Sequence, residues 1–366
     1  MFQISPAVFA VGNEYQIMIP VALETTMWVR VGEKTYYDAS NGILRSNTIV
    51  HRVAVPMEQL NKAKSYTVCL QKVIDRKPYF TETEDVVEKE FAFRPVVGDR
   101  VRAYHIADSH NMVEKPVKAA EAYGEIDFLI LNGDVPNHCG AEENIVTIYE
   151  LVSEITHGNI PTVFARGNHD TRGKYAERFA DYTPCKNGSS YYTFRLGGIW
   201  GLILDCGEDK LDSHPEYGNM MCCHDFRERE TEYIESVIAD AEKEYAAAGV
   251  THRMVVVHSP FTKRFKGDFD IEREIYAKWT SLLGEYIRPD FILCGHTHKI
   301  AVYECGSEMD AYGQSCPVIV GAEKRDLTEE KDVYYAGMGI AFCADKIELT
   351  VTDCFGKKEK MYQITL

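Results

Sequence analysis

Five short polar motifs follow apolar runs after residue 100 of this 366-residue chain, and their placement limits the folds that the chain can adopt. Each run has the length and the composition of a buried β-strand. In open α/β sheets, the residues after the carboxyl ends of the strands meet at one edge. We therefore expect one sheet edge to gather side chains from Asp108-Ser109-His110, Gly133-Asp134, Gly167-Asn168-His169-Asp170, His258 and Gly295-His296-Thr297-His298.

Strands and helices are predicted to alternate from residue 100 onward, as in α/β proteins. The clearest helix is predicted over 227–248, where Ile234, Val237 and Ile238 share one face. Other helices are predicted over 116–123, 142–156 and 271–287, and strands over 102–107, 127–131, 161–165, 191–196, 199–205, 254–257 and 291–294. The tail is predicted to be β-rich, over 300–304, 317–320, 333–342, 346–351 and 360–366. This order favours a four-layer α/β/β/α sandwich.

Residues 1–98 have a different pattern. Short runs rich in β-branched and aromatic residues are separated by turn signals such as Asn41-Gly42, and no long helical period intervenes. The runs cover 15–23, 27–31, 48–55, 65–73 and 90–93. They predict a small all-β sandwich domain of the fibronectin or immunoglobulin kind over 1–98, followed by a second domain over 99–366.

Composition narrows the classes of function. The formal charge of −16 argues against a general nucleic-acid binder, which needs a basic surface. No run of about 18 apolar residues exists, so no transmembrane helix is expected, and the first residues lack the pattern of a signal peptide. The 11 cysteines include no CxxC pair, and reduced thiols in the cytoplasm are expected. The oligomeric state stays open.

The motif side chains are of the types that bind metal ions. One divalent ion uses about four to six ligands, so the seven candidates suggest two ions that share a bridge. Asp134 is the expected bridge, because a carboxylate has two oxygens. The ions could be Mn, Fe, Zn, Ni or Co. The candidate ligands are Asp108, His110, Asp134, Asn168, His258, His296 and His298.

Such a pair of ions suits the chemistry of phosphate esters. Two ions roughly 3.5–4 Å apart can clamp a phosphate and lower the pKa of a bridging water toward about 7, so that hydroxide attacks phosphorus in line. His169 remains as a general acid or a transition-state donor. Its neighbour Asp170 is expected to fix the tautomer and the orientation of the His169 ring.

The ordered set resembles the calcineurin-like metallophosphoesterase superfamily, whose pattern is DxH, GD, GNH(D/E), H, GHxH, over roughly residues 100–300. The resemblance implies that His169 stabilises the charge that develops on the transferred phosphoryl group or the leaving group. It also implies that Asp134 bridges two ions. One ion would be held by Asp108, His110 and His298, and the other by Asn168, His258 and His296.

The sequence departs from two branches of this superfamily. A β-sandwich in front of the phosphoesterase domain is similar to the layout of purple acid phosphatases. Those carry a metal-binding tyrosine where this chain has Asn137, and glycine where it has His110, so a tyrosinate–iron chromophore is not expected. The protein Ser/Thr phosphatases carry GDxxDRG, and their phosphate-binding arginine is missing at that place.

The leading hypothesis is metal-dependent hydrolysis of a small-molecule phosphate ester. The Asp170 form of the third motif favours phosphodiesters, with a phosphomonoesterase for nucleotides or sugar phosphates as the alternative. A non-catalytic metal-binding scaffold is the alternative from another class, disfavoured because His169 and all the ligand types are present. The loops 206–226 and 260–270 are long enough to form lids. Substrate contacts are predicted for His138, Lys263 and Arg264.

Overall fold

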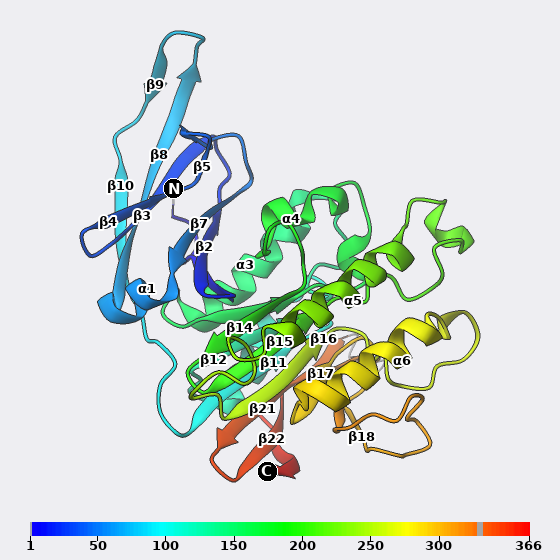
Figure 1. Cartoon of the computed structure of the whole chain (residues 1–366). Helices are drawn as coiled ribbons and strands as arrows, with labels where there is room; N and C mark the ends of the chain where they lie inside the picture. Colours follow the sequence, from blue (N-terminus) through cyan, green and yellow to red (C-terminus); the bar gives the residue numbers. More distant parts are fainter. Residues whose placement is uncertain (1, 328–331) are drawn as a thin grey trace.

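The computed structural model describes residues 2–327 and 332–366. Two large β-sheets form its centre, and helices cover the outer side of each (Figure 1). The helices α5 (Cys223–Ala239) and α6 (Arg273–Leu282) lie over one sheet. The helices α2 (Glu114–Tyr123) and α3 (Glu142–Thr156) pack on the other. The predicted α/β/β/α layering is confirmed.

In the first sheet, the first three motifs follow the central strands β11 (Val101–Ile106), β12 (Phe128–Asn132) and β13 (Thr162–Ala165). These strands pair in parallel and nearly every residue in them is buried, as a sheet covered on both faces requires. A further strand, β20 (Glu323–Leu327), pairs with part of β21 (Asp332–Cys343). The order of the other strands is β23 (Lys358–Thr365), β22 (Lys346–Asp353), β21 (Asp332–Cys343), β11 (Val101–Ile106), β12 (Phe128–Asn132), β13 (Thr162–Ala165), β1 (Ala7–Val11), β2 (Glu14–Pro20) and β7 (Val50–Pro56).

The second sheet carries the last two motifs. The side chains of its strand β15 (Ile199–Leu204) alternate between the two faces of the sheet. Trp200 and Leu202 pack against α5 and α6, whereas Ile203 joins the core between the two sheets. Trp279 of α6 is wholly buried in the same outer layer, which continues through a π-helical turn at Leu283–Ile287. The strand order is β14 (Tyr192–Leu196), β15 (Ile199–Leu204), β16 (His252–Val257), β17 (Phe291–Cys294), β19 (Val318–Val320) and β18 (Ala301–Tyr303).

The N-terminal segment forms the predicted β-sandwich at the top of Figure 1. One layer is a five-stranded sheet that packs against β7. Its strands are β3 (Thr25–Val31), β4 (Lys34–Tyr37), β8 (Ser65–Arg76), β9 (Thr81–Thr83) and β10 (Val87–Ala92). The short strands β5 (Ala39–Ser40) and β6 (Ile43–Leu44) and the helix α1 (Met57–Ala63) complete the segment, and a short helix α4 (Phe179–Tyr182) packs near β7.

The other layer of this sandwich is continuous with the first large sheet. Strand β1 pairs in parallel with β13, with Phe9 opposite Thr162, and the backbone N–H of Gly12 donates to the carbonyl of Thr193 at 2.7 Å. The division into domains at residue 98 therefore stays a prediction, and the strand pairing crosses it. The described part of the chain has no helix long and apolar enough to span a bilayer.

Because the sheet crosses residue 98, we predict that the chain unfolds in one cooperative transition. Phe9 is wholly buried and packs edge-on against Tyr149 and Phe164 of the following segment. Phe9→Ala should lower the free energy of unfolding by about 3–5 kcal/mol and shift the single calorimetric transition. Tyr79→Ala, at a side chain that is 91% exposed, is the control and should leave it in place. Two separate transitions would contradict the prediction.

Candidate metal centre

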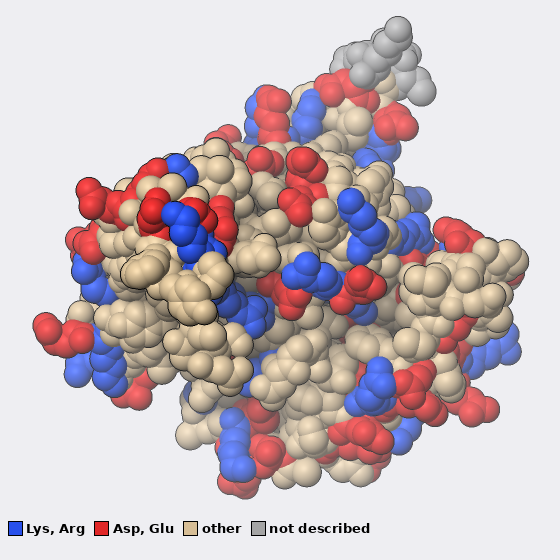
Figure 2. Space-filling model, turned by 90° about the horizontal axis from the view of Figure 1, so that it is seen from above, with Lys and Arg blue, Asp and Glu red and all other residues tan. Residues whose placement is uncertain are grey.

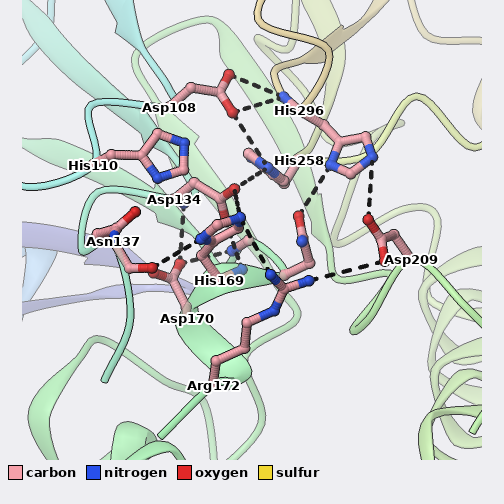
Figure 3. Close-up of polar contacts among 12 residues, drawn as sticks. Asp108, His110, Asp134, Asn137, His169, Asp170, Arg172, Asp209, His258 and His296 are labelled. Carbon is pink, nitrogen blue, oxygen red and sulfur yellow. Dashed lines mark hydrogen bonds and ion pairs between the residues drawn. The ribbon is translucent and has the colours of Figure 1, made fainter. Parts of the chain in front are cut away.

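The five motifs meet at one edge of the two sheets, as expected from their positions after strands. Asp108 follows β11 and Asp134 follows β12, while His258 and His296 follow β16 and β17 of the facing sheet. Figure 3 shows these side chains directed toward one another. His169 lies beside them, in a 3₁₀ turn over His169–Thr171 that follows β13. The pairing of strands therefore places side chains from opposite sheets in one cluster.

The backbone of this cluster is strained at the candidate ligands. Five of them have positive φ angles, between 45° and 70°, although none is glycine. Such conformations cost of order 1–3 kcal/mol each and persist only where the surroundings enforce them. The strained residues are Asp108, His110, Asp134, His296 and His298.

Glycines allow the close approach of these strand ends. A Cβ on Gly167 would lie 2.2 Å from Oδ1 of Asp134, and a Cβ on Gly295 would lie 2.5 Å from the Cβ of Ala107. Gly133 also has a positive φ of 76°. Gly133 is thus needed for its turn, whereas Gly167 and Gly295 are needed because any side chain would displace a neighbour.

The structure brings together the three side chains that the resemblance assigns to one ion. Ligand atoms of Asp108, His110 and His298 all lie within 4.8 Å of one another. Nε2 of His110 is 3.1 Å from Nε2 of His298, which is 3.3 Å from Oδ1 of Asp108. These atoms are close enough to share one cation.

The second assigned set also converges. Oδ1 of Asn168 is 3.0 Å from Nδ1 of His296, and the rings of His296 and His258 are 5.5 Å apart. Nε2 of His258 lies 3.2 Å from Oδ2 of Asp134 and 3.7 Å from Oδ1 of Asp108. Asp134 belongs to one group of ligand atoms with Asp108 and His258, and to another with His110 and His169. It therefore stands at the centre, where a bridge is expected.

Burial and charge set the ionisation states of these groups. Burial raises the pKa of Asp108 and Asp134, but the neighbouring histidines, His258 first, outweigh it, so that both carboxyl pKa values are below their usual range. Burial lowers the pKa of His258, yet the two carboxylates raise it to about 10. Burial lowers the pKa of His110 and of His296 to about 4. The carboxylates and the rings of His110 and His296 are therefore in the states that bind cations, and a cation at His258 would displace the proton of its ring.

The donor set fits divalent cations. Among the described residues, Nε2 of His258 is buried without a hydrogen-bond partner. A buried polar atom without a partner is costly, and a cation would supply the missing interaction. The other nitrogen of His258, Nδ1, lies 2.6 Å from the carbonyl oxygen of Asn132, which directs Nε2 toward the carboxylates.

The expectation that Asp170 orients His169 is wrong. Oδ2 of Asp170 instead accepts from the backbone N–H groups of Gly167 at 2.7 Å and Asp134 at 3.3 Å. The carbonyl of Asn137 accepts from Nδ1 of His169 at 2.8 Å. The 3₁₀ turn directs the two successive side chains differently, so Asp170 is wholly buried beneath the loops and ties them together.

The three predicted substrate-contact residues are engaged elsewhere. Nδ1 of His138 accepts from the N–H of Gly140 on its own loop at 3.0 Å. The guanidinium of Arg264 donates to the carbonyl of Asp310 at 3.1 Å, and Nζ of Lys263 lies over the ring of Phe265, 4.8 Å from its centroid. A role in substrate binding stays a prediction for His138, Lys263 and Arg264.

The loop 260–270 approaches the cluster through a different side chain. The ring of Phe265 is 6.3 Å from that of His296.

The sequence did not single out Arg172, Glu208 or Asp209. Nη1 of Arg172 lies 3.4 Å from Nε2 of His169, and the wholly buried Glu208 accepts from the same guanidinium. Oδ2 of Asp209 is 3.9 Å from Nε2 of His296. A 3₁₀ period of three residues could have related Arg172 to His169. No local pattern marks Glu208 or Asp209, which belong to a long loop.

A comparison with protein families decides how this cluster is classified. The sequence profile of the calcineurin-like phosphoesterase family matches residues 101–300, which cover more than half of the chain and all five motifs. The chain belongs to the calcineurin-like phosphoesterase family. It is therefore a hydrolase of phosphoric ester bonds, with Asp and His clusters that can bind the metal ions of a metallophosphoesterase.

A purple acid phosphatase of low sequence identity shares its architecture. Purple acid phosphatase PPD1 from seeds of yellow lupin (Lupinus luteus) has a TM-score of 0.57 at 12% identity, over 99% of this chain and 74% of that one. At this identity the likeness shows the fold. Vps29 of Chaetomium thermophilum has a TM-score of 0.31 at 10% identity, over 73% of this phosphoesterase and 98% of Vps29. No curated protein matches the chain.

The central position of Asp134 predicts how metal binding responds to its loss. The wild-type phosphoesterase, reconstituted with Mn²⁺ and passed through a desalting column, should retain about two ions per chain. Asp134→Asn should retain fewer ions, because a neutral amide replaces the carboxylate that belongs to both groups of ligand atoms. Elemental analysis measures the ratio, with the exposed Asp181→Asn as the control. Full retention by Asp134→Asn would contradict the bridging position.

Proposed function

We propose that this phosphoesterase hydrolyses phosphodiesters of small molecules with two bound metal ions. Asp108, His110 and His298 would hold one ion, and Asn168, His258 and His296 the other. Bound there, the ions would neutralise phosphate oxygens and supply an activated water. The observation that carries the proposal is the position of Asp134, whose carboxylate belongs to two groups of ligand atoms beside His169.

The residues of the chain prepare the site around that carboxylate. Asp134 accepts from the backbone N–H of His169 at 2.9 Å, which fixes the two motifs relative to each other. With Nδ1 of His169 held by the carbonyl of Asn137, Nε2 faces the cluster, 3.9 Å from Oδ2 of Asp134. From that position Nε2 can contact the phosphoryl group or the departing oxygen.

The charge and polarity of the surrounding loops support a diester. Three acids and two bases form an ion-pair group next to His169, so that a monoanionic diester meets less repulsion than a dianionic monoester. The acids are Glu208, Asp209 and Glu216, and the bases are Arg172 and Lys210. Leu211 and Met220 of the loop 206–226 and Phe269 of the loop 260–270 are exposed. Nζ of Lys210 lies over the ring of Phe269, 5.1 Å from its centroid, and we infer that apolar side chains of these loops receive the second ester group.

The identity of the ions and the cellular location stay predictions. The nitrogen and oxygen ligands suit Mn, Fe, Zn, Ni or Co. A cytoplasmic location agrees with the eleven cysteines, which are all free thiols in the structure. General binding of nucleic acid is not expected, and on the face in Figure 2 Lys and Arg are interspersed with Asp and Glu.

Turnover of matched aryl esters tests the proposal. After Mn²⁺ reconstitution, kcat/KM should be higher for bis(4-nitrophenyl) phosphate than for 4-nitrophenyl phosphate, with Asp134→Asn as the blank. Preference for the monoester would instead favour the phosphomonoesterase alternative. Bound ions without turnover of either ester, or of a panel of cyclic nucleotides and head-group diesters, would favour the non-catalytic scaffold.

A further inference from the structure

Arg172 is held in one orientation by a two-fold hydrogen bond. Its Nε donates to Oε1 of Glu208 at 2.9 Å and its Nη2 donates to Oε2 at 3.0 Å. This parallel geometry is specific to arginine and a carboxylate. The Glu208 side chain is wholly buried, whereas 27% of the Arg172 side chain is exposed. The pair therefore presents one face of the guanidinium at the surface of the site.

The third nitrogen of the guanidinium points into the site. Nη1 lies 3.4 Å from Nε2 of His169, the atom that faces the candidate metal ligands (Figure 3). The 3₁₀ turn accounts for this, because the backbone N–H of Arg172 donates to the carbonyl of His169 at 3.2 Å. Residues 169 and 172 thus lie one above the other on the same side of the turn.

The hydrogen bonds of His169 fix which of its atoms faces Arg172. Nδ1 of His169 faces the carbonyl of Asn137, which can only accept, so Nδ1 carries a proton. Nε2 is therefore the atom on the side of the candidate ligands, where Nη1 of Arg172 adjoins it. Arginine keeps its charge and all its protons throughout the working pH range. Arg172 is therefore a permanent donor at this position.

Glu208 is itself held from several directions. It also accepts from Oγ1 of Thr171 at 2.8 Å and from the hydroxyl of Tyr217 at 3.1 Å. Beneath it, the wholly buried Arg227 of α5 donates to the backbone carbonyl of Glu208 at 2.5 Å. The carboxylate is thus fixed before any ligand binds, which is the condition for effective electrostatic stabilisation.

We propose that Arg172 is a catalytic residue that donates from Nη1 to a non-bridging oxygen of the phosphoryl group, and that Glu208 is its positioning residue. This role rests on the proposed phosphoester hydrolysis at the same site. It supplies, from the residue after the 3₁₀ turn His169–Thr171, the cationic contact that the protein Ser/Thr phosphatases carry in their second motif.

The test compares Arg172→Ala and Arg172→Lys with Arg178→Ala, an exposed arginine of the same segment. In the Mn²⁺-loaded protein, Arg172→Ala should lower kcat for bis(4-nitrophenyl) phosphate by about 10²–10³-fold and leave the metal content unchanged. Free guanidinium ion should restore part of this loss. Arg172→Lys should recover only a fraction, because an ammonium group cannot form the fork with Glu208.

Calorimetry with inorganic phosphate gives a measurement that does not depend on turnover. Arg172→Ala should weaken phosphate binding to the Mn²⁺-loaded protein by about tenfold or more. Glu208→Gln should weaken it in the wild type but not further in Arg172→Ala, since a positioning residue acts through its partner. Additive losses would assign Glu208 to general stability of the loop and overturn its positioning role.

The outcomes separate this inference from the proposed function. If Arg172→Ala matches Arg178→Ala in both kcat and phosphate affinity, or loses its metal ions, Arg172 does not contact the phosphoryl group. If the wild type hydrolyses neither aryl ester nor any diester of the panel, the proposed function fails, while the phosphate measurements still decide whether Arg172 binds phosphate.

Discussion

Two buried carboxylates in mutual proximity are the constraint on which the rest of this structure depends. Asp108 and Asp134 are 0% and 1% exposed, and both face Nε2 of His258. Burying an ionised carboxylate is costly unless other charges or hydrogen bonds compensate it. This cost explains two features of the site. The strained backbone at the ligands and the lack of a side chain at Gly167 and Gly295 both bring the carboxylates within reach of histidines from the facing sheet.

A second layer of buried charge connects the outer helices to this centre. Arg227 of α5 donates to Glu272 at 3.1 Å, at the start of α6, and also to the loop that carries Glu208. Glu272 adopts a left-handed conformation with φ of 52°, and its carboxylate also lies 2.9 Å from Nδ1 of His224. Breaking a buried pair leaves an uncompensated charge. This network therefore ties the loop 206–226 to the start of α6, next to the end of the loop 260–270.

Local patterns in the sequence predict the elements whose structure is decided locally. The helix over 142–156 and the strand over 291–294 have the predicted bounds, since a helical apolar stripe and a short apolar run carry enough information. The placement of the motifs at strand ends predicted which side chains meet. It did not predict that Asp170 turns away from His169 or that Arg172 turns toward it, because spacing does not encode the direction of side chains in a 3₁₀ turn.

The sequence did not predict elements whose bounds depend on partners outside the local segment. Strand β1 was not predicted. It lies between β2, with which it forms a hairpin, and β13, about 150 residues away along the chain, so its short apolar run is enclosed on both sides only in the folded sheet. The helix predicted to reach residue 248 ends at Ala239. The following turns bring Tyr245 against Trp200, with ring centroids 5.6 Å apart, and place Glu244 where it accepts from the indole N–H at 2.9 Å. Tertiary contacts there override a high helix propensity.

The most direct test of the central claim is the anomalous diffraction of a crystal of the Mn²⁺-loaded protein. Our account predicts two peaks about 3.5–4 Å apart, with the Asp134 carboxylate between them. One peak should lie against Asp108, His110 and His298, and the other against Asn168, His258 and His296. A single peak, or a pair of peaks away from Asp134, would contradict it.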